Sequence, residues 1–196
     1  MKNGYTTRVV FKAKYLPTNP KYGTGESSLP DGTWFMVGAG QQPYSEKALK
    51  EAITAAGDTA PGSWTTDETG KVTNLGTKAD AALGDVYYFK GGICYYPAYI
   101  RHFLASEHKT ETQGFATEET WKTNFASTGA YADYDLGRYG IVRNNWYKLT
   151  LKSLSAPGSP VVPTPDPDTL DDLTKLYVDC DVQILAWNVR NHDIDL

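Results

Sequence analysis

Five prolines between residues 157 and 168 divide the chain and limit what this stretch can form. Proline has no backbone N–H, so the stretch (PGSPVVPTPDPD) cannot pair in a central strand and is predicted to run extended across the surface. The residues that follow it, 176–187, alternate with the period of a half-buried strand. The sequence therefore predicts a main domain over residues 1–156, a proline- and aspartate-rich linker over 157–175 and a C-terminal strand segment over 176–196.

The C-terminal strand segment has the most regular strand pattern in the sequence. Its apolar residues fall at alternate positions and share one predicted face: Val178, Cys180, Val182 and Ile184. Twelve extended residues span about 40 Å, which is the length of a sandwich sheet. Two arrangements remain open from this pattern: the strand completes its own sheet, or it is lent to a neighbouring molecule.

The main domain combines short strands with two predicted helices. Strand patterns cover residues 6–16, 32–38 and 146–154. On either side of Gly91 and Gly92, two further apolar runs predict a hairpin or a bulged strand, over residues 86–89 and 93–103. Helices are predicted over residues 45–56, with Ser45 as N-cap and Gly57 as stop, and over residues 117–125. Residues 58–85 are polar and turn-rich. This pattern predicts a β-sandwich with helical insertions.

The charge of the chain is small and unevenly distributed. The net charge of −4 gives no support for nucleic-acid binding. Residues 166–196 contain eight aspartates and two basic residues, a balance of −6, so residues 1–165 carry +2. The acidic end is either a solvated tail or a segment that the body of a neighbouring subunit attracts. No apolar run reaches the roughly 18 residues that a membrane-spanning helix needs.

Residues typical of catalytic or metal sites do not form a recognisable motif. His102, His108 and His192 stand at no metal-ligand spacing. The aspartates that follow Pro165 lack the glycine and the closing glutamate of a calcium loop. Nucleophile-elbow and phosphate-loop patterns are also missing from the sequence. The sequence therefore predicts a protein that is not an enzyme, with no catalytic residue, cofactor or metal.

The cysteines and tryptophans each leave an alternative open. The cysteines match no metal or redox spacing and are predicted to be buried thiols, with a disulfide as the alternative in an exported protein: Cys94 and Cys180. The tryptophans are predicted to pack in the core or on strand faces. The alternative function is a cell-surface carbohydrate-binding β-sandwich module, in which sugars stack on Trp34, Trp64, Trp121, Trp146 and Trp187.

Three longer stretches resemble the C-terminal domain of the Bacteroidales fimbrillins, the subunits of type V pili. They are TTRVVFKAK over residues 6–14, GGICYYPAYIRH over 91–102 and LGRYGIVRNNWYKLTLKSLSAPGSP over 136–160. The last leads through the linker to the closing VQILAWNVRNHDIDL over residues 182–196. Together they follow the family order over most of the chain and are most similar to the short-fimbria (minor fimbrillin) group.

The resemblance implies a mainly β, transthyretin-like Greek-key sandwich with one or two short helical insertions. It implies a structural subunit of a bacterial surface fimbria that polymerises by strand exchange and supports adhesion. The implied donor strand would contribute Val178, Cys180, Val182, Ile184 and Trp187. The implied partners are other fimbrillin subunits and accessory pilus proteins, with host or bacterial surface receptors as further candidates.

Family members are exported through the outer membrane as lipoprotein precursors and act in the extracellular fimbria. This chain departs from the family pattern because it carries no signal region, no lipid-bearing cysteine near its start and no full N-terminal domain. We therefore expect it to represent the C-terminal domain, and any membrane contact to go through a lipid anchor outside this chain.

Overall fold

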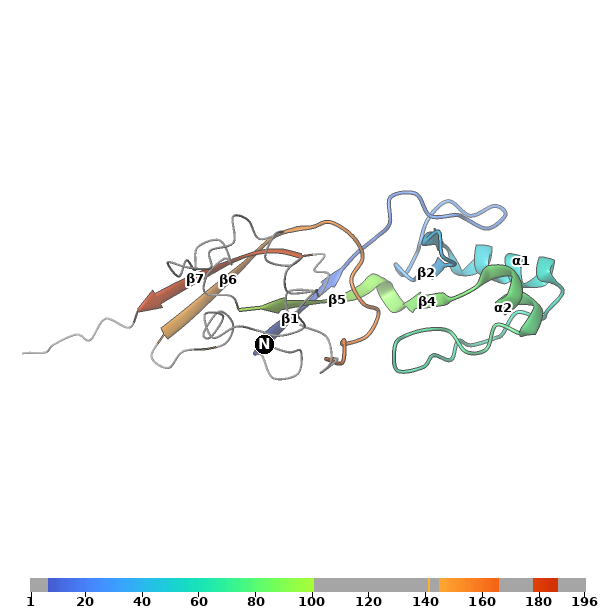
Figure 1. Cartoon of the computed structure of the whole chain (residues 1–196). Helices are drawn as coiled ribbons and strands as arrows, with labels where there is room; N and C mark the ends of the chain where they lie inside the picture. Colours follow the sequence, from blue (N-terminus) through green and yellow to red (C-terminus); the bar gives the residue numbers. More distant parts are fainter. Residues whose placement is uncertain (1–6, 101–140, 142–144, 166–177, 187–196) are drawn as a thin grey trace, which may run out of the picture. The chain divides into compact units, whose positions relative to one another are not determined.

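The computed structural model describes residues 7–100, 141, 145–165 and 178–186 (Figure 1). The chain forms two compact units. The first contains Met1–Val9, Pro97–Ser155 and Thr164–Leu196, and the second contains Val10–Tyr96 and Ala156–Pro163. Strands β1 (Arg8–Lys14) and β5 (Ile93–Tyr99) pair with each other, and each has residues in both units.

The described residues are mainly β, with antiparallel sheets, as the sequence predicts, and they also form two short helices. In the second unit, β2 (Trp34–Val37) lies between β3 (Gln42–Tyr44) and β4 (Val86–Phe89), antiparallel to both. The core of this unit joins the sheet to its helices and loops through Phe35, Val37, Leu49, Ile53, Val72, Leu75, Ala79 and Val86. The Greek-key connection stays a prediction.

Both outer strands of this three-stranded sheet have a covered edge. Lys21 forms a parallel bridge with Tyr44 of β3, and Lys71 forms an antiparallel bridge with Tyr87 of β4. The Lys21 N–H donates to the Pro43 carbonyl at 2.7 Å. Loop backbone therefore occupies hydrogen-bonding positions at which a strand of another molecule could otherwise add to the sheet.

The helix predicted over residues 45–56 is confirmed as α1 (Glu46–Ala56). The Ser45 hydroxyl accepts a hydrogen bond from the Ala48 N–H at 3.1 Å, which caps the first turn. At the other end Gly57 has φ 91°, a left-handed conformation that favours glycine, and it closes the helix. Local capping residues therefore define both ends of this helix.

Replacing this cap, Ser45→Ala, is expected to lower the free energy of unfolding by about 1–2 kcal/mol. Ser45 is fully buried, and its hydroxyl also accepts from the Gly23 N–H at 3.3 Å and donates to the Glu26 carboxylate. Urea unfolding followed by circular dichroism measures the change. Ser28→Ala, at an exposed serine, is the matched control. Equal stability of the two variants would contradict the capping role.

A second helix, α2 (Thr77–Leu83), falls within the stretch that the sequence predicts as turns. Its N-cap is Gly76, which offers no side-chain cap. The Asp58 carboxylate takes this place and accepts from the N–H groups of Lys78 and Ala79, each at 2.8 Å. Because the capping carboxylate comes from a distant part of the sequence, no local start signal marks the helix.

Of the two arrangements predicted around Gly91 and Gly92, a hairpin or a bulged strand, the hairpin is wrong, because β4 and β5 belong to different sheets. Gly91 has φ 62° and Gly92 has φ 73°, in a short 3-10 turn that carries the chain from one sheet to the next. A Cβ atom on Gly92 would come within 2.9 Å of the carbonyl oxygens of Tyr15 and Gly32. The glycine pair therefore allows a close crossing of the backbone rather than a hairpin.

The helix predicted over residues 117–125, and residues 101–103 of the strand predicted after Gly92, lie outside the described residues. Neither helix in the described part of the chain has the length and apolar content needed to cross a membrane.

Candidate functional site

Four of the five sequence-predicted polymerisation residues lie on a two-stranded sheet of the first unit (Figure 1): Val178, Cys180, Val182 and Ile184. The strand predicted over residues 146–154 is confirmed as β6 (Asn145–Leu154), and the C-terminal strand as β7 (Val178–Ala186). The two strands pair antiparallel from Asn145↔Ala186 to Leu154↔Val178. In this structure the candidate donor strand therefore pairs within its own chain.

The register gives one face of this sheet an apolar character. Tyr147, Leu149 and Leu151 lie opposite Ile184, Val182 and Cys180. Alternate residues of a strand share a face, so the four predicted residues of β7 from Val178 to Ile184 lie on one side. Trp187 lies outside the described residues.

A β-bulge keeps the apolar face continuous to the end of β6. The register of paired residues shifts between Leu151 and Ser153 and passes over Lys152, as in a β-bulge. Leu154 follows Leu151 by three residues, an odd spacing that would normally turn it to the other face. The extra residue returns Leu154 to the side of Leu151, opposite Val178.

The other face of the sheet is polar except at the pair formed by Trp146 and Leu185. Lys148 lies opposite Gln183, and Thr150 lies opposite Asp181. Trp146 of this apolar pair is 67% exposed. The contrast between the two faces matches the alternation that the sequence predicts for a half-buried strand.

The first residues of the predicted linker lie against the second unit. Ala156–Pro163, which we call the strap, belongs to this unit, whereas the residues on either side belong to the first unit. Ser159 of the strap forms an antiparallel bridge with Tyr95 of β5. The strap therefore has a defined position on a strand.

Neither cysteine forms a disulfide. Cys94 of β5 is fully buried, and this burial raises the pKa of its thiol. Cys180 of β7 is half-buried. The structure thus agrees with the predicted free thiols and not with the disulfide alternative.

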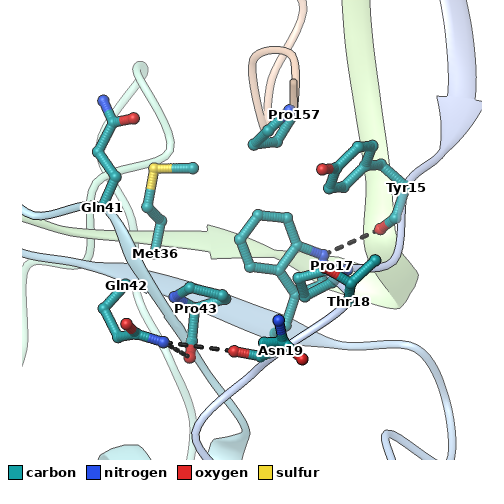
Figure 2. Close-up of a pocket in the computed structure, with 10 residues that line it drawn as sticks. Tyr15, Pro17, Thr18, Asn19, Met36, Gln41, Gln42, Pro43 and Pro157 are labelled. Atoms are coloured by element: carbon teal, nitrogen blue, oxygen red, sulfur yellow. Dashed lines mark hydrogen bonds between the residues drawn. The ribbon is translucent and has the colours of Figure 1, made fainter. Parts of the chain in front are cut away.

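The second unit contains a shallow pocket of about 300 Å³ (Figure 2). Proline rings, aromatic rings and uncharged polar side chains line it: Tyr15, Pro17, Thr18, Asn19, Trp34, Met36, Gln41, Gln42, Pro43 and Pro157. These residues come from four separate places in the sequence, which explains why no sequence pattern indicated the pocket.

The chemistry of the pocket is neutral. None of its lining residues is charged, so it offers no counter-charge to a phosphate, a carboxylate or a metal ion. The Trp34 N–H donates to the Tyr15 carbonyl at 3.1 Å, and the indole stacks on Phe89 with ring centroids 4.0 Å apart. Because Trp34 is only 1% exposed, it serves as a packed wall rather than a platform for a sugar.

The other described tryptophans do not line this pocket. Trp64 packs on Phe35 at 4.8 Å between ring centroids and donates to the Glu46 carboxylate at 3.2 Å. Trp146 is exposed on β6, whereas Trp121 lies outside the described residues. The carbohydrate-binding alternative stays a prediction.

Among the described residues, no group of three or more His, Cys, Asp or Glu side chains could hold a metal ion. The three histidines of the sequence lie outside the described residues.

Comparison with known protein families gives a match for the part of the chain that contains β6 and β7. Residues 121–193 match the family described as major fimbrial subunit protein type IV, Fimbrillin, C-terminal. No curated protein matches the chain. The match supports a structural role in a surface fimbria and includes the bulged strand, the strap and the candidate donor strand. Over residues 121–193 the chain is therefore similar to the fimbrillin C-terminal family.

Proposed function

We propose that this protein polymerises into a bacterial surface fimbria by strand exchange, with β7 as the strand that one subunit lends to the next. The family match over residues 121–193 carries the proposal. The apolar face of β7 supports it, since alternate apolar side chains can fill successive pockets while the backbone adds to a sheet. Each buried side chain of this kind contributes about 1.5–3 kcal/mol.

Exchange requires β7 to leave β6 of its own chain. The ladder between Asn145 and Leu154 on one side and Val178 and Ala186 on the other must open, and an equivalent ladder must form in the neighbour. The backbone hydrogen bonds lost and gained then nearly balance, so the fit of the apolar face in the receiving groove determines the preference. The paired form described above corresponds to the subunit before assembly.

A single substitution tests this step, because Leu151 lies directly opposite the native Cys180. Opposed residues of antiparallel strands have Cα atoms about 4.5–5.5 Å apart, within the range that a disulfide spans. Oxidised Leu151→Cys is expected to hold β7 on β6 and to stop polymerisation, and reductant is expected to restore it. Negative-stain electron microscopy and sedimentation measure the polymer.

The control is Thr150→Cys, which places a thiol on the opposite face, where the partner residue is Asp181. This variant should polymerise under both redox conditions. If oxidised Leu151→Cys contains the disulfide, verified by mass spectrometry, and still polymerises like the wild type, β7 is not the exchanged strand.

The same proposal covers the export, the location and the partners of the subunit. We propose that the precursor is exported through the outer membrane as a lipoprotein and that the assembled fimbria is extracellular and adhesive. Its partners are other fimbrillin subunits and accessory pilus proteins, with surface receptors on host or bacterial cells. The acidic balance of residues 166–196 favours contact with the more basic remainder of a neighbouring chain.

A further inference from the structure

The strap has an unusual course. The chain leaves the first unit after Ser155, runs through the second unit as Ala156–Pro163 and returns to the first unit at Thr164. The connection between β6 and β7 therefore includes a segment that packs in the second unit.

Backbone hydrogen bonds hold the centre of the strap on β5. The Tyr95 N–H donates to the Ser159 carbonyl at 2.8 Å, and the Ser159 N–H donates to the Tyr95 carbonyl at 3.0 Å. The Ser159 hydroxyl also accepts from the Val161 N–H at 3.3 Å, which shapes the chain just after the bridge. Prolines 157, 160 and 163 surround this bridge and have no N–H to donate, so the contact stays a single bridge and does not extend into a strand.

One glycine in the strap and one in the residues that it contacts allow the strap to pack closely within the second unit. A Cβ atom on Gly158 would lie 2.5 Å from the Tyr95 carbonyl oxygen and 2.9 Å from the Tyr96 ring. On the receiving side, a Cβ atom on Gly70 would lie 2.5 Å from the Pro160 ring. The absence of a side chain at each position thus permits a contact that any other residue would push apart.

The strap also covers buried side chains of β5. Cys94 and Tyr96 flank Tyr95 on the opposite face of the strand and are 0% and 1% exposed. The Gly158 backbone lies within hydrogen-bonding reach of the Cys94 thiol, and burial raises the pKa of this thiol. The reactivity of Cys94 therefore reports whether the strap is in place.

We propose that the strap is a fixed anchor, which stays on β5 when β7 is exchanged, so that the exchanged segment begins after Pro163. This inference rests on the proposed function. The sequence between the strap and β7 is then residues 164–177, and 14 residues can span at most about 50 Å. The anchor thus limits the distance between the strap and the receiving groove of the neighbouring subunit. It also keeps β7 at a high effective concentration beside that groove.

A disulfide across the bridge tests the anchor during assembly. Tyr95 and Ser159 exchange both backbone hydrogen bonds, which places their Cα atoms about 5.5 Å apart and suits a disulfide. The double variant Tyr95→Cys/Ser159→Cys is expected to polymerise at the wild-type rate when oxidised. Peptide mapping confirms that the new disulfide does not involve Cys94.

Polymerisation that is slower by about tenfold or more in the oxidised variant, and recovers with reductant, would overturn the anchor while leaving strand exchange in place. If the wild-type protein does not polymerise at all, the proposed function fails instead. The anchor is then judged by the reactivity of Cys94, which does not depend on assembly.

Alkylation of Cys94 by a maleimide, located by peptide mapping, provides that second measurement. In the native protein we expect slow labelling of Cys94, and labelling about tenfold faster in Gly158→Ala, because the added methyl group pushes the strap from β5. Gly62→Ala is the control, since a Cβ atom there meets no other atom within 4 Å. Wild-type Cys94 that reacts as fast as in urea would show that the strap does not stay in place, and would refute the anchor.

Discussion

Val182→Asp is expected to abolish polymerisation, whereas Gln183→Asp, at the next residue of β7, is expected to leave it intact. Val182 is half-buried on the apolar face opposite Leu149, while Gln183 is exposed on the polar face opposite Lys148. A carboxylate placed among apolar side chains without a partner costs several kcal/mol, either in its own sheet or in the groove of a neighbour. The same carboxylate on the polar face meets water and the Lys148 ammonium.

The two variants carry the same new charge at adjacent positions, so a difference between them reflects the face of the strand and not the net charge. Sedimentation and electron microscopy measure the polymer, and the near-ultraviolet circular dichroism of the Trp34 and Phe89 pair checks the second unit. Equal polymerisation of the two variants would mean that the apolar face of β7 makes no contact between subunits. A chain that ends at residue 175 should behave like Val182→Asp.

Trp34→Ala is expected to lower the free energy of unfolding by about 3–5 kcal/mol, the cost of removing a large aromatic side chain from a core. Trp34 is 1% exposed, stacks on Phe89 and is held by the hydrogen bond of its N–H to the Tyr15 carbonyl. Its removal loses this packing and leaves the Tyr15 carbonyl without its indole partner. Urea unfolding of the full chain measures the change.

Trp146→Ala is the matched control, because Trp146 has the same side chain but is 67% exposed on β6. We expect this substitution to change the free energy of unfolding by less than about 0.5 kcal/mol. If both variants lose the same stability, Trp34 does not have the central place in the core that its burial indicates.

Local signals were sufficient where both ends of an element are marked in the sequence. For α1 the serine cap, the apolar spacing and the terminal glycine predicted the helix to within a residue. For β7 the strict alternation from Val178 to Ile184 predicted both the strand and its apolar face. These features depend on residues that lie close together in the sequence, within one or two helical turns or a few strand positions. They can therefore be recognised without knowledge of the tertiary fold.

Features that depend on distant residues could not be predicted in this way. The helix α2 begins where the carboxylate of Asp58 supplies its cap, and the sequence around Gly76 does not show this. The apolar runs of β4 and β5 were found, but the sheets that they join depend on the close crossing at Gly92. The proline content predicted an extended segment after residue 157, yet its place on Tyr95 depends on the absence of a side chain at Gly70 and Gly158.

The covered edges of the β3–β2–β4 sheet have a consequence for a protein that is displayed in many copies. Subunits along a filament stand at high local concentration, where open strand edges on adjacent filaments would join side by side into sheets. The backbone at Lys21 and Lys71 occupies such positions on the two outer strands of this sheet. If the subunits assemble as proposed, the covered edges of this sheet are expected to disfavour side-by-side joining and to keep neighbouring fibres separate.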